Sequence, residues 1–119
     1  MVAVKSTVPV GTSDEVERWI YEHQKHPVHI EVAANPEFLS QGTAVKDMLH
    51  ASRIVLGVES PHAEKVMKEL YDPFYLPYVV TDRKSAEMVK YVSNVFLALK
   101  ISYISCNKDF PIVRFCFPS

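Results

Sequence analysis

Five polar residues of this chain could do chemistry, and they fall into three groups along the sequence. Ser6 and Thr7 follow a short apolar run, and Glu37 follows a second one. Lys90 and Asn94 are four residues apart, a spacing that places them on one face of a helix. In an open α/β sheet, ligands bind in the crevice outside the carboxyl ends of the strands. If both apolar runs are strands, the two hydroxyls and the carboxylate lie at such positions.

Each group also has a structural interpretation that the spacing alone leaves open. Ser6 and Thr7 could serve as turn and helix-cap residues. Glu37 follows a proline and could be a first-turn carboxylate favoured by a helix dipole. Lys90 and Asn94 could lie on a solvated helix face. The residue pattern alone therefore indicates an α/β domain with a candidate ligand crevice, and no more.

Composition and charge argue against several classes of protein. Apolar residues make up 48% and charged residues 23% of the 119 residues, which fits one globular domain rather than a disordered chain. The net charge is -1 and the basic residues are scattered, so we expect neither a nucleic-acid partner nor an anionic membrane surface. No apolar run reaches membrane-spanning length.

Metal and disulfide chemistry are not expected either. The five histidines show no metal-ligand spacing, so we predict no metal site. Cys106 and Cys116 form neither a disulfide framework nor a metal-binding pattern. The default expectation is a cytoplasmic protein with reduced thiols.

Strand and helix patterns alternate along the chain, which indicates α/β architecture with a parallel sheet. The expected strands cover residues 1–5, 28–33, 53–57 and 77–81. The expected helices cover residues 12–23, 61–71 and 82–104. Thr12 and Glu15 fit a capping box for the first helix. Ser60 with Pro61 fits the start of the second helix, and Asp82 can cap the third.

Four motifs, in this order, resemble those of the UDP-glucose/GDP-mannose dehydrogenase family. They are KSTVPVG (5–11), NPEFL (35–39), RIVLG (53–57) and SAEMVKYVSN (85–94), the last followed by FLA (96–98). The stretch 38–45 is most similar to the UDP-glucose branch of that family. The resemblance covers residues 1 to about 104.

The resemblance implies a two-step oxidation of the C6 alcohol of a UDP-sugar to a carboxylate, with NAD as the cofactor and the intermediate held on a cysteine thiol. In that scheme Thr7 positions a water, and Glu37 acts through it as the general base. Lys90 stabilises the oxyanion that forms at C6. Asn94 holds substrate and water by hydrogen bonds.

The resemblance also implies which residues bind the two ligands. The expected cofactor-binding residues are Ser6, Thr7, Val8 and Gln41. The expected substrate-binding residues are Glu37, Phe38, Leu39, Lys90 and Asn94. Many members carry a glutamate where Gln41 stands, and the glutamine keeps the hydrogen-bonding shape but removes a charge.

By the same resemblance, residues 1–81 form the second half of a Rossmann-like NAD-binding domain. Residues 82–104 form the first long helix of an all-α dimerisation domain, and residues 105–119 form a divergent tail that we expect to be disordered or frameshifted. The long helix has an apolar stripe through which we expect a homodimer. Its members are Val89, Val92, Phe96, Leu99 and Tyr103.

Two parts of the family pattern are missing from the sequence. Its three glycines form no G-x-G-x-x-G phosphate loop. The stretch Cys116-Phe117-Pro118 copies three letters of the family's thiol segment but lacks the preceding glycine, so we expect it to belong to the tail. We therefore expect a fragment that is inactive alone. Two alternatives stay open: a non-catalytic remnant that dimerises, and a sister enzyme for GDP-mannose or a UDP-N-acetyl sugar.

Overall fold

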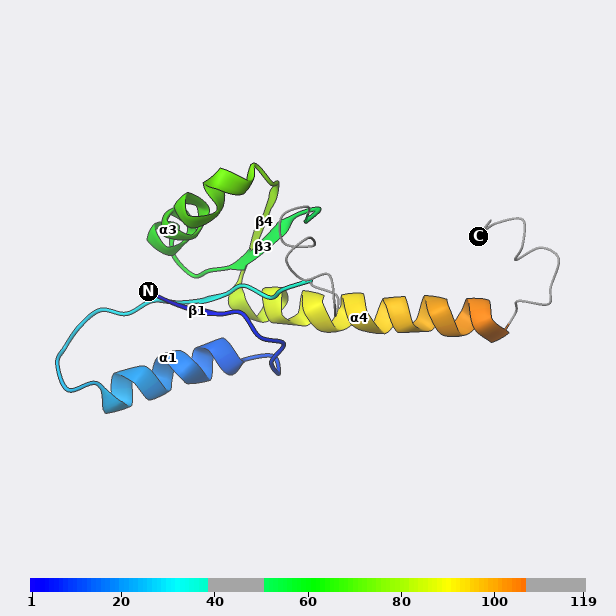
Figure 1. Ribbon diagram of the computed structural model, residues 1–119. Helices are drawn as coiled ribbons and strands as arrows, with labels where there is room; N and C mark the ends of the chain where they lie inside the picture. Colours follow the sequence, from blue (N-terminus) through cyan, green and yellow to red (C-terminus); the bar gives the residue numbers. More distant parts are fainter. Residues whose placement is uncertain (39–50, 107–119) are drawn as a thin grey trace.

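The computed structural model describes residues 1–38 and 51–106 (Figure 1). In chain order the elements are β1 (Val2–Val4), α1 (Thr12–His23), β2 (Val32–Ala34), β3 (Ile54–Gly57), α3 (Pro61–Tyr71), a 3-10 turn (Asp72–Phe74), β4 (Tyr78–Thr81) and α4 (Arg83–Cys106). This order confirms the predicted alternation of strands and helices. Leu39, Gln41 and residues 107–119 of the expected tail, with Cys116, lie outside the described residues. Ser105 and Cys106, which we expected to begin the divergent tail, are instead the last two residues of α4.

The sheet has four strands in the order β1-β2-β3-β4, and it is mixed rather than wholly parallel. β1 and β2 are parallel, as are β3 and β4, and a helix connects the strands of each pair. β2 and β3 meet antiparallel at one position, Ala34 opposite Gly57. The alternation pattern fixes strand direction only within a strand–helix–strand unit, which is why it predicted the two pairs and not this junction.

The second strand is shorter than the sequence pattern predicted. Residues 28–33 alternate between apolar and polar side chains, yet β2 begins only at Val32. β1 begins at Val2, which pairs with Val32, so residues 28–31 have no strand opposite them in the described part of the chain. Alternation without a neighbouring strand does not make a ladder, and Val28 is accordingly exposed.

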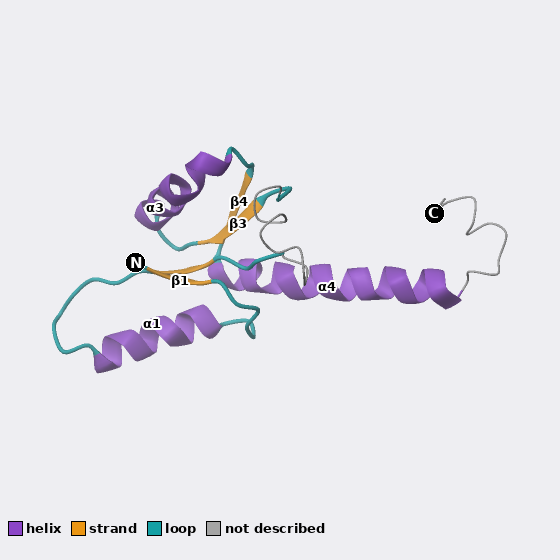
Figure 2. Ribbon diagram, viewed as in Figure 1, coloured by secondary structure: helices purple, strands orange, loops and turns teal. Residues whose placement is uncertain are grey.

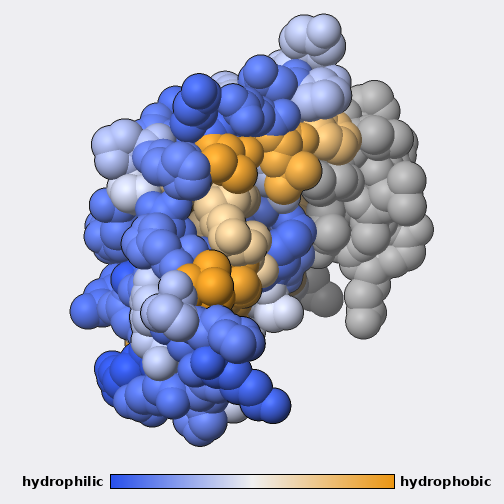
Figure 3. All heavy atoms as spheres, turned by 90° about the vertical axis from the view of Figure 1, so that its left-hand side faces the viewer, coloured by the Kyte–Doolittle hydropathy of each residue, from blue (hydrophilic) through white to orange (hydrophobic). Residues whose placement is uncertain are grey.

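Both faces of the sheet are covered, α3 lying on one side and α1 with α4 on the other (Figure 2). On the α3 side, Leu56 packs with Met67 and Tyr71. On the α4 side, Val55 packs with Ala86. Successive residues of β3 therefore point to opposite faces, which explains why that strand reads as a continuous apolar run. Viewed from the side on which the N-terminus lies, apolar side chains form a strip between hydrophilic surfaces (Figure 3).

Local cap chemistry correctly predicted the starts of two helices. Ser60 Oγ accepts a hydrogen bond from the backbone N–H of Ala63 at 3.0 Å, and Pro61 opens α3. Asp82 Oδ1 accepts one from the backbone N–H of Ser85 at 2.8 Å and so caps α4.

The predicted capping box of α1 was wrong. The N-cap residue is Gly11, whose φ of 95° lies in the left-handed region that suits glycine. Thr12 is therefore already inside the helix, and its hydroxyl donates backwards to the carbonyl of Pro9 at 2.6 Å. Glu15 uses its backbone N–H on the carbonyl of Gly11 in the ordinary helical pattern. The side chain that caps α1 comes instead from α4, as shown below.

Arg83 holds the first turn of α4 against α1. Its guanidinium is 2.8 Å from Asp14 and 2.9 Å from Glu17, both on α1, and 3.6 Å from Glu59 after β3. Burial works to lower the pKa of Arg83, but the hydrogen bond to Glu17 and the surrounding carboxylates raise that pKa above its ordinary value. Arg83 stays charged and fixes the position from which α4 leaves the sheet.

Candidate active site

The ends of two parallel strands bring the first two predicted groups together. β1 and β2 lie side by side, so the loops that leave them start at the same edge of the sheet. The Thr7 hydroxyl donates a hydrogen bond to Oε1 of Glu37 at 3.3 Å. The structure thus places this hydroxyl and this carboxylate beyond the carboxyl ends of their strands, as predicted, and brings the two into contact.

The third group reaches the same carboxylate from α4. Lys90 is 7% exposed, and its ammonium nitrogen lies 3.8 Å from Oε1 of Glu37. The same ammonium lies 5.2 Å from the centre of the Phe38 ring, within the range of a cation–π contact. Lys90 is therefore not on a solvated face: it is a buried cation beside a carboxylate and an aromatic ring.

These contacts involve only one of the two carboxylate oxygens of Glu37. Thr7 and Lys90 both approach Oε1. Oε2 is buried, and no group in residues 1–38 or 51–106 donates a hydrogen bond to it. Buried acceptors in folded proteins are almost always satisfied, and a water or a ligand hydroxyl is one kind of donor that would satisfy this oxygen.

The remaining predicted site residues are less constrained. Asn94 lies four residues after Lys90 on α4 and is exposed. Ser6 is exposed and Val8 is half-buried, both in the loop after β1. The structure places all three near the sheet edge or on the α4 face that continues from Lys90. Their ligand contacts, and those of Leu39 and Gln41, stay predictions.

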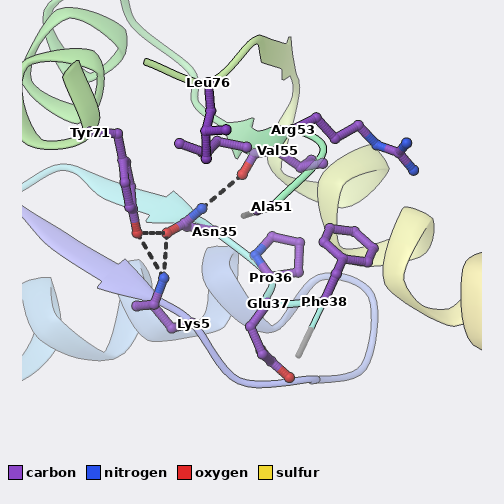
Figure 4. Close-up of a pocket in the computed structure, with 11 residues that line it drawn as sticks. Lys5, Asn35, Pro36, Glu37, Phe38, Ala51, Arg53, Val55, Tyr71 and Leu76 are labelled. Atoms are coloured by element: carbon purple, nitrogen blue, oxygen red, sulfur yellow. Dashed lines mark hydrogen bonds between the residues drawn. The ribbon is translucent and has the colours of Figure 1, made fainter. Parts of the chain in front are cut away.

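A polar cluster that sequence reasoning missed joins the same strand ends (Figure 4). The Lys5 ammonium donates to Oδ1 of Asn35 at 2.8 Å and to the Tyr71 hydroxyl at 2.7 Å. The Tyr71 hydroxyl donates to the same Asn35 oxygen, and Asn35 Nδ2 donates to the Val55 carbonyl at 2.9 Å. The cluster ties both strand ends to α3 and β3. The sequence pointed to this cluster only through Asn35. This residue directly follows a buried strand, where a side-chain amide needs hydrogen-bond partners.

The cavity beside this cluster is too small to hold a nucleotide. Its volume is about 60 Å³, whereas sites for drug-sized ligands span roughly 300–1,000 Å³. Ala51, Arg53 and Leu76 contribute to its wall. In Figure 4 the Glu37 carboxylate points away from the Lys5–Asn35–Tyr71 cluster. The candidate site is therefore the open sheet edge beyond Glu37, and the cavity is part of its support.

A second missed residue, Glu87, lies one turn before Lys90. It is 3% exposed and accepts three hydrogen bonds from the start of α1. The donors are the Gly11 N–H at 2.6 Å, the Ser13 N–H at 2.8 Å and the Ser13 hydroxyl at 2.7 Å. Glu87 thus supplies the cap that the local sequence does not.

The described ranges contain neither a metal cluster nor a membrane-spanning helix. No three histidine, cysteine, aspartate or glutamate side chains gather there in a way that could hold a metal ion. None of the helices in those ranges is long and apolar enough to cross a membrane.

Comparison with known proteins decides the family. Residues 1–75 match the NAD binding domain of the UDP-glucose/GDP-mannose dehydrogenase family. The chain belongs to this family. A UDP-glucose 6-dehydrogenase of Bacillus subtilis is 50% identical to it over 105 residues, which are 88% of this chain and 24% of the relative. A UDP-glucose 6-dehydrogenase of Rhizobium meliloti is 47% identical over 110 residues, again 88% of this chain, and 25% of the relative.

Solved structures of family members agree with the fold. A UDP-glucose dehydrogenase of Pyrobaculum islandicum superposes with a TM-score of 0.81 at 45% identity, covering 86% of this chain and 24% of that one. A GDP-mannose dehydrogenase of Pseudomonas aeruginosa gives a TM-score of 0.79 at 33% identity, covering 87% and 24%. These neighbours confirm the Rossmann-like dehydrogenase fold, and the family match confirms NAD as its cofactor. The chain spans about a quarter of the length of these relatives.

Proposed function

We propose that this dehydrogenase-family chain supplies the nicotinamide-side loop, the general base and the oxyanion-stabilising lysine of an NAD-dependent UDP-glucose 6-dehydrogenase. The observation that carries the proposal is the convergence of Thr7, Glu37 and Lys90 at one sheet edge, with Oε2 of Glu37 buried and without a donor among the described residues. The choice of UDP-glucose rests on the two relatives of that name at 47–50% identity.

The residues present fit one end of the cofactor. Ser6 and Thr7 are exposed just beyond the carboxyl end of β1, where open α/β sheets bind dinucleotides. No G-x-G-x-x-G loop stands among the three glycines of the sequence, so these residues fit the nicotinamide end and not the pyrophosphate. NAD, when bound, supplies the hydride acceptor.

The chain's own residues handle protons and charge. Oxidation of an alcohol removes a hydride from carbon and a proton from oxygen. Glu37 accepts that proton on Oε2, directly or through a water held by Thr7. Lys90 offers a fixed positive charge to the oxygen on which negative charge develops. Because Lys90 is held in place before reaction, it needs no reorganisation when that charge appears. Asn94 extends the same helix face toward the substrate.

The proposal also covers the dimer surface, the substrate and the compartment of the enzyme. Val92, Phe96, Leu99 and Tyr103 are each at least 57% exposed, and they form the surface through which the enzyme pairs as a homodimer. The substrate is a UDP-sugar, and the cytoplasm, where cysteines stay reduced, is the compartment. A specificity for GDP-mannose is the second candidate, since one solved neighbour carries that name at 33% identity.

A chimera tests this function. The aligned segment of this chain replaces the matching stretch of the Bacillus subtilis relative, and NADH formation is followed with UDP-glucose, GDP-mannose and UDP-N-acetylglucosamine. We expect turnover with UDP-glucose, and none from the isolated chain. If the chimera folds but forms no NADH with any of the three sugar nucleotides, the segment is a non-catalytic dimerising module. A preference for GDP-mannose or the N-acetyl sugar would overturn the specificity.

A further inference from the structure

Glu87 is a buried carboxylate that the proposed reaction does not use. Its two oxygens are both occupied: Oε2 by the N–H of Gly11, and Oε1 by the N–H and hydroxyl of Ser13. Gly11 and Ser13 are 76 and 74 positions away from it in sequence, so these contacts join distant parts of the chain. A side chain held this firmly between elements constrains what lies next to it.

The neighbouring segment is the loop that carries the nicotinamide-side residues. It is fixed at its start by Lys5, which binds Asn35 and Tyr71. It is fixed at its end by Gly11, which binds Glu87. Thr7 lies between the two anchors.

The same helix face fixes the other half of the site. Glu87 and Lys90 are three residues apart and both buried, so they project from one face of α4. Lys90 approaches Glu37, and Glu37 accepts from Thr7. The contacts therefore close a ring that runs from α4 through the loop and the β2 end back to α4.

We propose that Glu87 is a positioning residue: through its bond to Gly11 it sets the place of Ser6–Val8 relative to Glu37, and hence the approach of the nicotinamide to the substrate carbon. This inference rests on the proposed function. Displacing a reacting group by about 1 Å can lower the rate on the order of 10²-fold. The bond between Glu87 and Gly11 can therefore affect the rate although Glu87 does not touch the substrate.

A purely structural cap is the competing explanation, and two substitutions separate it from positioning. In Glu87→Gln, the amide oxygen can still accept from Ser13, but the NH₂ group then faces the N–H of Gly11, donor against donor. This change breaks the bond from Gly11, at the end of the loop, and keeps the bonds from Ser13, inside α1. Ser13→Ala removes only the hydroxyl donor of Ser13 and leaves the bonds from the backbone N–H groups of Gly11 and Ser13 in place.

A matched carboxylate elsewhere provides the control. Glu31 accepts hydrogen bonds from the Ser60 hydroxyl and from His62 at the start of α3. Glu31→Gln therefore loses comparable contacts at a helix start that does not border the Ser6–Val8 loop. Any effect that depends only on weakening a cap appears in this variant too.

The measurement is kcat and KM for NAD and UDP-glucose in the chimera, beside the unfolding midpoint of each variant. We expect Glu87→Gln to lower kcat about 10- to 100-fold with a smaller change in KM. Ser13→Ala and Glu31→Gln should keep kcat within about 2-fold while lowering the midpoint. If Glu87→Gln does not fold, Glu87→Asp, which keeps both acceptors on a shorter side chain, should show the same loss of kcat in smaller measure.

Three results decide the matter. A fall in kcat confined to the Glu87 variants supports the inference. Equal kcat in Glu87→Gln, Ser13→Ala and Glu31→Gln would sink it and leave Glu87 as a cap, while the proposed function stands. An unsubstituted chimera without turnover would overturn the proposed function, and the positioning role with it.

Discussion

The two halves of α4 use the same helix for opposite purposes. In the first two turns, Arg83, Ala86, Glu87 and Lys90 are buried, and three of these four side chains are charged. From Tyr91 onward the helix continues past the sheet without interruption (Figure 1). There the large apolar residues are exposed, Phe96 at 60% and Leu99 at 63%.

This distribution reverses the usual order of burial, in which apolar residues lie inside and charged ones outside. Buried charges are retained where they are paired, and each charged residue of the proximal half has a partner from another element. Exposed apolar residues in a row indicate a surface that another molecule or segment covers. We therefore propose that the proximal half belongs to the site and the distal half to an interface.

The largest effect should come from removing the proximal lysine. In the chimera, Lys90→Ala should lower kcat on the order of 10²-fold, because the charge matters most when the oxyanion develops. KM for UDP-glucose should change less than kcat. Lys100→Ala is the matched control, since Lys100 is exposed on the distal half, where its ammonium lies over the Phe96 ring. A Lys90 variant that changes KM alone would make this lysine an ordinary binding residue.

The distal half should govern self-association. Phe96→Glu places a charge in the middle of the apolar row and should raise the dimer dissociation constant about 10- to 100-fold, as for a central aromatic of an interface. Sedimentation at tens of micromolar, with concentrations varied around that value, measures it. Lys84→Glu, an exposed change on the proximal half, should leave association unchanged. An unsubstituted chain that sediments as a monomer would contradict the interface.

Sequence predicted what depends on neighbouring residues and on sheet geometry. Ser60 and Asp82 were correctly predicted as caps because a cap is decided within three residues. Thr7 and Glu37 were correctly placed beyond the carboxyl ends of two strands, and they meet because those strands are parallel and end at one edge. The roles of Glu87 and Arg83 could not be predicted, since their partners on α1 are more than 60 residues away. The early start of the second strand was wrong because alternation says nothing about the length of the strand opposite.

Gly57 tests how closely the proximal half must pack. A Cβ at this position would lie 2.6 Å from the Cβ of Ala86 and 2.8 Å from the Cα of Arg83. Gly57→Ala should therefore destabilise the fold by about 1–3 kcal/mol through overpacking, measured by denaturant unfolding. Adding Ala86→Gly removes the nearer of the two atoms and should recover part of the loss, but not all, because the Arg83 backbone remains close. Full stability of the single variant would mean that α4 can move away from β3 at no cost.

The smallest effect concerns the charge of Asp82, the residue that caps the start of α4. Hydrogen bonds from the Ser85 hydroxyl and backbone N–H hold the pKa of Asp82 below its ordinary value of 3.8. A carboxyl whose pKa is lower in the folded state stabilises the fold above its unfolded pKa, and this contribution is lost as the pH falls through the folded pKa. Asp82→Asn keeps an acceptor for the cap and removes only the charge. Its thermal midpoint should thus lie slightly below that of the unsubstituted chain at neutral pH, and the two should converge well below pH 3.8. A gap that stays constant with pH would show that the cap acts through its geometry and not through its charge.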